Sequence, residues 1–180
     1  MKTENLERFL ESFGGKVVEQ AKKRLKQKKG NTALGDSIRF EVKADVNGFS
    51  TKFFMEDYGT FLDKGVSGNK NPISYNTGTT MKSSPYKYTS KGPPIDILSK
   101  WIKKKRIKPK GLGRGRSKKT GQYISAFAYL ISRKIKREGI KSISFFQIPL
   151  GLGLKEVKDK MLKELKLDIE TYLTTYYNPK

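Results

Sequence analysis

Carboxylate, hydroxyl and amine groups are the only side chains in this sequence that could carry out catalytic chemistry. The 180 residues include no Cys and no His. Their absence excludes disulfides, thiol nucleophiles, zinc fingers and every catalytic triad or metal site that depends on His. It also removes the usual general base at neutral pH. An enzyme built from this chain would have to use Asp or Glu, a Ser–Lys pair, or Tyr.

One carboxylate pair with a nearby lysine stands at Asp36, Glu41 and Lys43. In restriction-type nucleases, two such carboxylates hold Mg²⁺ and the lysine positions the attacking water. Glu41 and Lys43 share one face of a predicted strand, but Asp36 lies an odd number of residues away, which places it on the other face. We therefore interpret Glu41 and Lys43 as a solvated strand face. We expect a protein without enzymatic activity, without a cofactor and without a bound metal.

The densest charge lies in residues 103–119, where ten of seventeen side chains are Lys or Arg and none is acidic. Gly111, Gly113 and Gly115 keep this segment flexible, and Pro109 prevents a continuous helix. A flexible cationic segment can follow phosphates without a fixed geometry, which predicts contact with DNA or with an acidic protein surface. The alternative is a solvated loop that only aids solubility. The candidate contact residues are Lys103, Lys104, Lys105, Arg106, Lys108, Lys110, Arg114, Arg116, Lys118 and Lys119.

The chain as a whole is strongly basic, with 39 Lys and Arg against 17 Asp and Glu and a net charge of +22. Without the ten charges of residues 103–119 it would still carry 22 − 10 = +12, which we interpret as a property of the whole molecule. Such a charge repels itself unless a polyanion or an acidic partner offsets it. DNA, RNA, an anionic membrane and an acidic protein surface remain open by charge alone. No sequence-specific nucleic-acid-binding motif is recognisable.

Hydrophobic patterning indicates that the protein is soluble and that a membrane is not among its partners. No segment approaches the ~20 consecutive apolar residues that a membrane-spanning helix needs. The first residues, MKTENLERFLESF, do not have the pattern of a signal peptide.

The elements that must position these side chains predict an α+β fold, in a single domain over residues 1–180. A β-hairpin over residues 37–55, with the turn signal Asn47-Gly48, forms the centre of a small antiparallel sheet. An N-terminal helix and two to three further helices pack on it. Helices are predicted at 4–29, 57–65, after Pro93-Pro94, at 123–138 and at 154–177, with an extended apolar stretch at 143–150. Long loops are predicted at 66–92 and 103–122, because these segments are rich in Ser, Thr, Asn, Gly and Lys.

The first and last helices carry apolar stripes at three- and four-residue spacing, which is typical of helices packed against a core. In the first helix, Gly14-Gly15 weakens the middle and a kink is expected there. Tyr172, Tyr176 and Tyr177 could form a partner surface, but we favour core packing with exposed hydroxyls. The stripes consist of Leu6, Phe9, Leu10, Phe13, Val17, Ala21 and Leu25 in the first helix, and of Leu154, Val157, Met161, Leu165, Ile169, Leu173 and Tyr176 in the last.

The segment YGTFLDKGVSG, from Tyr58 to Gly68, resembles the neck proteins of tailed bacteriophages, the head–tail joining or tail-completion family. In that family an N-terminal helix and a β-hairpin precede a Tyr- and Gly-containing segment that opens a loop. A later helix, an extended Phe-containing stretch and a final helix follow. The predicted elements of this chain follow the same order, and its composition is similar to that of crAss-like and other Bacteroidetes phages.

The resemblance implies a structural virion protein, assembled in the host cytoplasm, that forms or joins a ring between portal and tail around the DNA channel. Its partners would be other neck, portal or tail proteins and further copies of itself, with genomic DNA as an additional candidate. Inter-subunit contact is assigned to Tyr58, Phe61, Leu62, Tyr75, Tyr86 and Tyr88. The alternative hypothesis is a sequence-nonspecific nucleic-acid-binding protein, and a more distant one is the Mg²⁺ nuclease.

Overall fold

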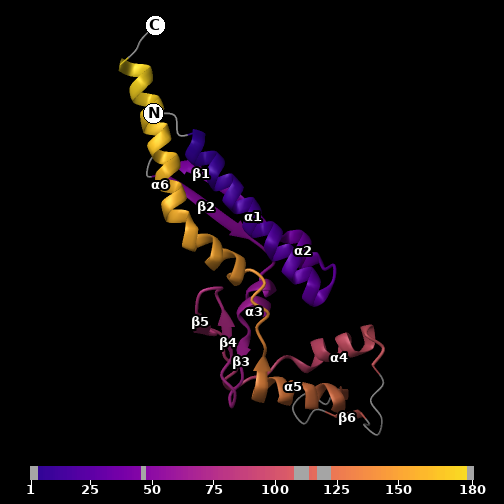
Figure 1. The fold of residues 1–180 in the computed structure, drawn as a ribbon. Helices are drawn as coiled ribbons and strands as arrows, with labels where there is room; N and C mark the ends of the chain where they lie inside the picture. Colours follow the sequence, from indigo (N-terminus) through magenta and orange to yellow (C-terminus); the bar gives the residue numbers. More distant parts are fainter. Residues whose placement is uncertain (1–3, 46–47, 108–113, 117–122, 178–180) are drawn as a thin grey trace. The chain divides into compact units, whose positions relative to one another are not determined.

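The computed structural model describes residues 4–45, 48–107, 114–116 and 123–177, and it has the predicted α+β architecture (Figure 1). Its contacts divide the chain into two compact units. Unit 1 contains residues 1–63, 75–82 and 143–180, and unit 2 contains residues 64–74 and 83–142. The expectation of a single domain stays a prediction, because a compact unit is not necessarily a part that folds alone.

Unit 1 is built around a long N-terminal helix and a β-hairpin, both as predicted from the sequence. Helix α1 spans Glu4–Lys29 and is followed by the short helix α2, Ala33–Ser37. Strands β1, Arg39–Asp45, and β2, Gly48–Phe54, form the hairpin and pack against α1. Helix α3, Tyr58–Lys64, comes next, and helix α6, Gln147–Tyr177, packs along α1.

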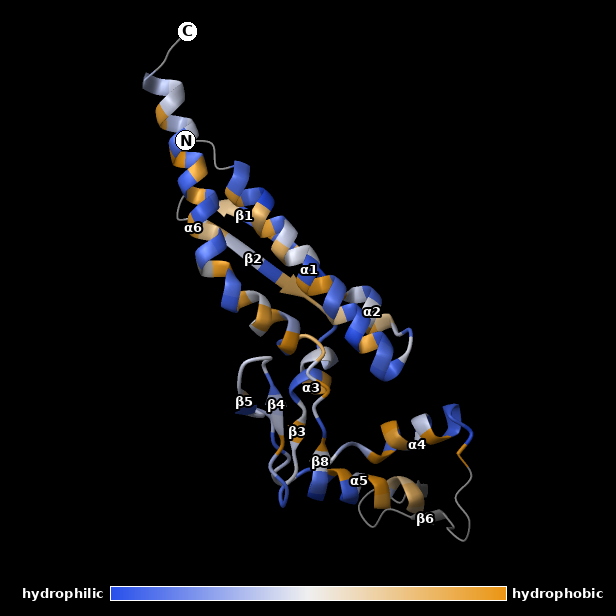
Figure 2. Cartoon of the chain, viewed as in Figure 1, coloured by the Kyte–Doolittle hydropathy of each residue, from blue (hydrophilic) through white to orange (hydrophobic). Residues whose placement is uncertain are grey.

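The core of unit 1 lies between α1, the residues after it and the segment that precedes α6. The apolar stripe of α1 supplies its centre, since Val17, Ala21 and Leu25 are almost fully buried. Apolar and hydrophilic residues alternate along α1 at helical spacing (Figure 2). The helix stops where Gly30 adopts a φ of 75° and donates its N–H to the Lys26 carbonyl at 2.8 Å. The other buried members of the core are Leu34, Ile38, Phe145 and Phe146.

The hairpin has the register that its alternating pattern predicts. Phe40 lies opposite Phe53 and Glu41 opposite Lys52 in an antiparallel ladder. The Phe53 ring contacts the rings of Phe13 and Phe146 edge-on, which joins the hairpin to both helices of unit 1. At the turn, Gly48 has a φ of 124°, a conformation that favours glycine. Asn47, the other half of the predicted turn, lies outside the described residues.

Helix α1 is continuous through Gly14-Gly15, so the expected kink is absent from this described part of the chain. Gly14 is buried, and a Cβ at this position would overlap the ring of Phe40. Gly15 has no neighbour within 4 Å of where a Cβ would stand. The first glycine is therefore required by packing against the hairpin, whereas the second is not.

The last helix begins earlier than predicted. Residues 143–150 were expected to be extended, but α6 starts at Gln147 and contains Pro149, Gly151 and Gly153. Proline is compatible with a first helical turn, because the N–H groups there have no acceptor within the helix. Gly151 and Gly153 face the Thr77 carbonyl and the Phe13 ring, where a Cβ would collide with each. Close packing overrides the weak helix propensity of these residues.

Two buried carboxylates hold the N-terminal ends of the long helices. Asp63, which is 2% exposed, accepts the Phe146 N–H at 2.8 Å and the Gln147 N–H at 3.4 Å at the start of α6. Asp168, on α6 and 3% exposed, accepts the N–H groups of Asn5 and Leu6 at 3.1 Å each at the start of α1. Each carboxylate satisfies N–H groups that a helix leaves unpaired and lies at the positive end of the helix dipole.

Unit 2 consists of two helices and several very short strands. Helix α4, Ile95–Lys104, packs against helix α5, Ala126–Glu138. Strand β3, Val66–Ser67, pairs with β8, Gly139–Ile140, and β6, Arg114–Arg116, pairs with β7, Tyr123–Ser125. The helix predicted at 123–138 thus begins three residues late, because residues 123–125 pair with β6 instead.

The segment 66–92, predicted as a long loop, contains three strands of two or three residues. They are β3 and a pair formed by β4, Ser74–Asn76, and β5, Met81–Ser83. Strands this short show no alternating pattern in the sequence, and side-chain hydroxyls support them. Ser67 accepts the Ile73 N–H at 2.9 Å, and Ser84 donates to the Gly65 carbonyl at 2.7 Å.

The two adjacent glycines of α1 provide a matched test of the packing against the hairpin. We expect Gly15→Ala to raise the free energy of unfolding by about 0.5–1 kcal/mol, because alanine is the better helix former. Gly14→Ala should lower it by about 1–3 kcal/mol, because the new methyl group overpacks against Phe40. Urea unfolding of both variants measures the difference. Equal effects would show that Gly14 does not contact the hairpin.

The buried cap of α6 is tested by Asp63→Ala. We expect a loss of about 1–3 kcal/mol in the free energy of unfolding, because two N–H groups of the helix would lose a charged acceptor in the interior. Asp63→Asn keeps one carbonyl acceptor and should lose less. Asp159→Ala, an exposed acidic residue on α6, is the control and should change stability by no more than about 0.5 kcal/mol. An effect of Asp63→Ala as small as the control's would remove the cap from the argument.

Candidate nucleic-acid interface

The positive charge of the chain is concentrated in unit 2. The sequence of this unit has 20 Lys and Arg and 2 Asp and Glu, a net charge of 20 − 2 = +18. Unit 1 has the other 19 Lys and Arg with 15 Asp and Glu, a net charge of 19 − 15 = +4. The basic character is therefore not a uniform property of the molecule, as the sequence had suggested. It belongs largely to one unit, and a polyanion would be attracted to that unit.

A wide groove of about 1030 Å³ lies on this basic unit. One wall is the polar face of α5, and the others are the segment after β3 and the residues that lead into α4. Five cationic side chains line the groove, and one carboxylate accompanies them. The lining residues that matter for binding are Lys70, Tyr129, Arg133, Lys134, Lys136, Arg137 and Glu138.

The groove is formed where the segment after β3 closes on the end of α5. Asn69 donates its N–H to the Lys136 carbonyl at 2.9 Å, and Lys70 donates to the Arg137 carbonyl at 3.1 Å. These bonds satisfy two carbonyls that the end of a helix leaves free. Gly68 makes the approach possible, because a Cβ there would overlap the Arg137 carbonyl. The glycine of the Tyr58–Gly68 segment thus brings Lys70 beside the cations of α5.

Hydrogen bonds also fix the residues that lead into α4. The Ser132 hydroxyl donates to the Pro93 carbonyl at 2.7 Å, and the Lys136 ammonium donates to the Ser90 carbonyl at 2.6 Å. Lys136 therefore has a structural bond as well as a charge. The side chains of Arg133, Lys134 and Arg137 remain largely exposed, and these three residues offer the freest cations of α5.

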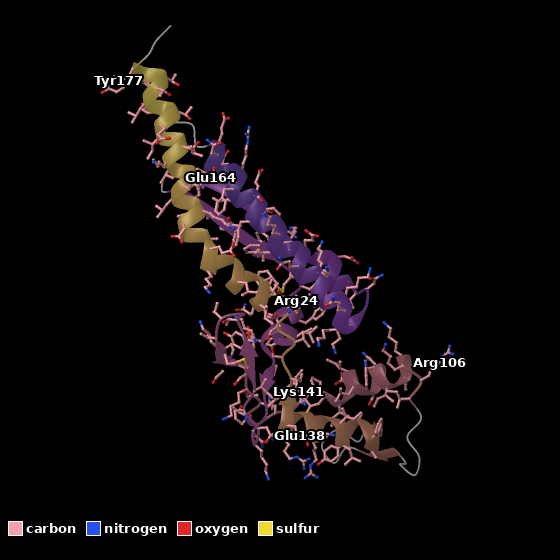
Figure 3. All side chains as sticks on the ribbon, in the orientation of Figure 1. Arg24, Arg106, Glu138, Lys141, Glu164 and Tyr177 are labelled. Atoms are coloured by element: carbon pink, nitrogen blue, oxygen red, sulfur yellow. The ribbon has the colours of Figure 1, made fainter. Side chains whose placement is uncertain are left out.

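Glu138 is the single carboxylate among the lining residues of this groove. Its pKa lies below the usual value for Glu, first because Arg137 donates a hydrogen bond to it at 2.7 Å and further because Lys134 and Lys141 are near. Lys134 lies 3.9 Å away. Glu138 is therefore ionised at neutral pH and offsets part of the local charge (Figure 3). The cations still outnumber it, so the groove keeps a positive potential.

Exposed aromatic rings accompany the cations in unit 2. Tyr129, on the groove wall, is 43% exposed, and the Arg133 guanidinium lies 5.9 Å from its ring centroid. Trp101 on α4 is 44% exposed. Proteins that bind single strands combine a basic groove with rings on which bases stack, and phosphate contacts alone suffice for a duplex. Both kinds of contact are available on this unit.

Four of the predicted contact residues lie together at the end of α4. Lys103, Lys104, Lys105 and Arg106 are all exposed, and Arg106 points away from the helix end (Figure 3). Lys105 ends the helix by donating its N–H to the Trp101 carbonyl at 2.9 Å. Arg114 and Arg116 belong to β6, of which the structure describes the backbone pairing alone. The remaining predicted residues, Lys108, Lys110, Lys118 and Lys119, lie outside the described residues.

The sequence missed the cations of α5 as part of a site. Arg133, Lys134, Lys136 and Arg137 are close together in the sequence, but a helix with a polar face is usually only solvated. Lys70 lies in a predicted loop and carried no signal. What identifies these residues is the backbone pairing between the segment after β3 and the end of α5, which a single sequence does not reveal.

The aromatic residues assigned to inter-subunit contact fall into two groups. Tyr58 and Phe61 are exposed on α3, at 50% and 43%, and are available at the surface. Tyr75 is buried, and Leu62 packs against the core of unit 1, so neither presents its side chain fully to a partner. Tyr86 and Tyr88 are half-buried, and burial raises the pKa of the Tyr88 phenol. The assignment stays a prediction and rests best on Tyr58 and Phe61.

The nuclease-like residues do not form a metal site among the described residues. Asp36 lies in the short helix α2, whereas Glu41 and Lys43 lie on β1. The Lys43 ammonium is 3.8 Å from the Glu41 carboxylate, and both side chains are substantially exposed. Within the described part of the chain, no group of three or more acidic residues is placed to hold a metal ion. This geometry fits a solvated ion pair.

We expect no cleavage of plasmid DNA in the presence of Mg²⁺ or Mn²⁺, because an exposed ion pair offers a metal no second carboxylate. The measurement is a nicking assay of the purified protein beside its Glu41→Gln variant. Cleavage by the unmodified protein that disappears in Glu41→Gln would contradict this prediction.

Comparison with models of protein families, with curated proteins and with solved structures finds no match. Among the described helices, none is both long enough and apolar enough to cross a membrane.

Proposed function

We propose that this chain is a non-enzymatic structural protein of the neck of a tailed bacteriophage, and that unit 2 contacts the genomic DNA. In this proposal the protein forms or joins a ring between portal and tail. Its other partners are neck, portal or tail proteins, and it resides in the virion after assembly in the host cytoplasm.

The observation that carries the DNA contact is the segregation of charge. Unit 2 has a net charge of +18 and unit 1 of +4, so the repulsion within unit 2 is large and an anionic partner would relieve it. Its exposed cations lie on separate elements, at the end of α4 and along α5. No rigid base-reading element accompanies them, which favours contact with phosphates over sequence-specific recognition.

The neck assignment is supported by the structural roles of the Tyr58–Gly68 segment, which resembles the neck family. Asp63 caps α6, Gly65 has a φ of 72° next to the Ile140 carbonyl, and Gly68 closes on the end of α5. Each of these residues is needed for a specific backbone conformation or contact, which gives the resemblance a physical basis. Tyr58 and Phe61 leave exposed rings on the same segment, as a subunit contact would require.

The second candidate function is a sequence-nonspecific nucleic-acid-binding protein without a role in the particle. The exposed aromatic rings of Tyr129 and Trp101 beside the cations favour it equally. The two functions differ in their partners: a neck protein binds isolated portal or tail proteins, whereas a general nucleic-acid-binding protein needs nucleic acid alone.

Salt dependence of duplex binding tests the role of unit 2. Neutralising the α4 terminus with Lys103→Gln, Lys104→Gln, Lys105→Gln and Arg106→Gln should flatten the slope of log affinity against log salt. Each lost phosphate contact changes the slope by about 0.9. The matched control replaces four exposed lysines of unit 1, Lys23, Lys26, Lys28 and Lys29, by Gln and should leave the slope nearly unchanged.

Equal slopes for the two variants would contradict a DNA contact by unit 2. The same two variants, introduced into a phage that encodes this chain, separate the remaining alternatives. If the α4 variant folds but does not enter particles, the cations bind an acidic neighbouring protein. If particles form and retain DNA with normal infectivity, residues 103–106 have no contact role.

A further inference from the structure

The C-terminal part of α6 is an exposed amphipathic helix. All residues from 169 to 177 are exposed. Ile169, Tyr172, Leu173 and Tyr176 follow one another at three- and four-residue spacing, so they lie on one face of the helix. This face, called the tail stripe below, continues the sequence pattern that predicted a buried helix, and the expected core packing of Tyr172, Tyr176 and Tyr177 is wrong.

A helix of this length is not stable in water without a partner. Isolated helices shorter than about 12–15 residues are marginal, and residues 169–177 extend past Asp168, which marks the start of α1. Figures 1 and 3 show α6 continuing beyond the N-terminal end of α1 to Tyr177. Tyr172 and Tyr176 already form a pair, with ring centroids 4.5 Å apart, and a hydrogen bond to Tyr176 raises the pKa of the Tyr172 phenol.

Unit 1 also has an apolar groove between α1 and the first turns of α6. Its volume of about 440 Å³ is within the range of about 300–1,000 Å³ that is usual for binding pockets. Phe9, Phe13 and Val17 line it from α1, and Pro149, Leu152 and Val157 line it from α6. The small Gly153 keeps it open on the α6 side.

The rim of this groove is positive, whereas the tail stripe is acidic. Lys16 and Lys160 stand on the rim with Glu156. The pKa of Glu156 is lowered, first by a hydrogen bond from Lys160 and further by Lys155 and Lys16, so positive charge is in excess there. Residues 168–177 contain Asp168 and Glu170 and no Lys or Arg, although the chain as a whole is at +22. Lysines at the rim could also contact the tyrosine rings as cations over π-faces.

The tail stripe of one chain does not reach the groove of the same chain. Both belong to the continuous helix α6, in which Gly153 and Leu173 lie twenty residues, or ~30 Å, apart. An intramolecular contact would require the helix to fold back on itself. A second copy can bring its tail stripe to the groove without any such change.

We propose that the tail stripe of one copy of this chain inserts into the groove between α1 and α6 of a second copy. The contact is head-to-tail, since each copy offers a groove at one end of α6 and a stripe at the other. Contacts of this type generate closed rings or open filaments. The inference uses unit 1 alone and does not depend on DNA binding by unit 2, and its failure would leave the proposed function open to other ring contacts.

Self-association measures the proposal directly. Sedimentation of the full chain from micromolar to sub-millimolar concentration, at high salt to screen the +22 net charge, should show association. Leu173→Glu with Tyr176→Glu should abolish it, because both charges fall on the stripe. Thr171→Glu with Thr174→Glu is the matched control on the opposite face of the same helix, and it should associate like the unmodified protein. A chain that stays monomeric throughout, or a control as defective as the stripe variant, overturns the proposal.

Cysteine cross-linking identifies the surface that receives the stripe, because the chain has no Cys of its own. Ser12→Cys places a thiol at the groove and Tyr177→Cys places one at the tail. A mixture of the two variants should cross-link through a short bis-maleimide to a dimer, far more than either variant alone. Leu152→Glu, an exposed groove residue, should abolish the product when added to the Ser12→Cys chain, with helix content unchanged by circular dichroism. Equal cross-linking of Tyr177→Cys alone would show that tails pair with tails, and this result would overturn the proposal.

Discussion

The N-terminal end of α6 is held by a carboxylate from a distant part of the chain. Asp63 is 83 residues from Phe146 in sequence, yet it is nearly inaccessible to solvent and accepts the first free N–H groups of the helix. The carbonyls of Leu62 and Asp63 also accept the N–H groups of Ile143 and Ser144. A carboxylate at the C-terminal end of its own helix is unfavourable, and the charge is compatible with burial only because α6 supplies the donors. The position where α6 starts, and hence the closure of the core, depends on this contact.

A second carboxylate completes the arrangement in unit 1. Asp168 lies on α6 and caps α1, while α6 itself is capped by Asp63. The antiparallel packing of α1 and α6 is therefore fixed in register at one end by a cap and along its length by Gly153 against Phe13. Beyond Asp168 this constraint ends, and the helix continues with its apolar residues exposed. The groove and the tail stripe are two consequences of the same fixed register.

Unit 2 is held together in a different way. It carries a net charge of +18, and its described ion pairs involve Glu138 alone. Its shape depends on backbone pairing of β3 with β8, on Gly65, Gly68 and Gly139 at close backbone approaches, and on hydroxyls that bond to carbonyls. These interactions are short-ranged and tolerate the repulsion among surface cations, which is weakened further by salt. A unit stabilised in this way can present cations on several elements to one polyanion.

The sequence by itself determined the local structure wherever the pattern was long and regular. Helix α1 and the hairpin β1–β2 follow directly from apolar periodicity and from the Asn47-Gly48 turn, because one buried face is enough to specify each. The sequence also showed the basic segment after α4. It did not determine the start of α6, the strands of 66–92 or the division of charge between units. Those depend on contacts such as Asp63 with α6 and Asn69 with α5, which join residues far apart in the chain. A stripe such as that of α6 is apolar whether or not a neighbour covers it, so only the tertiary structure shows that it is exposed.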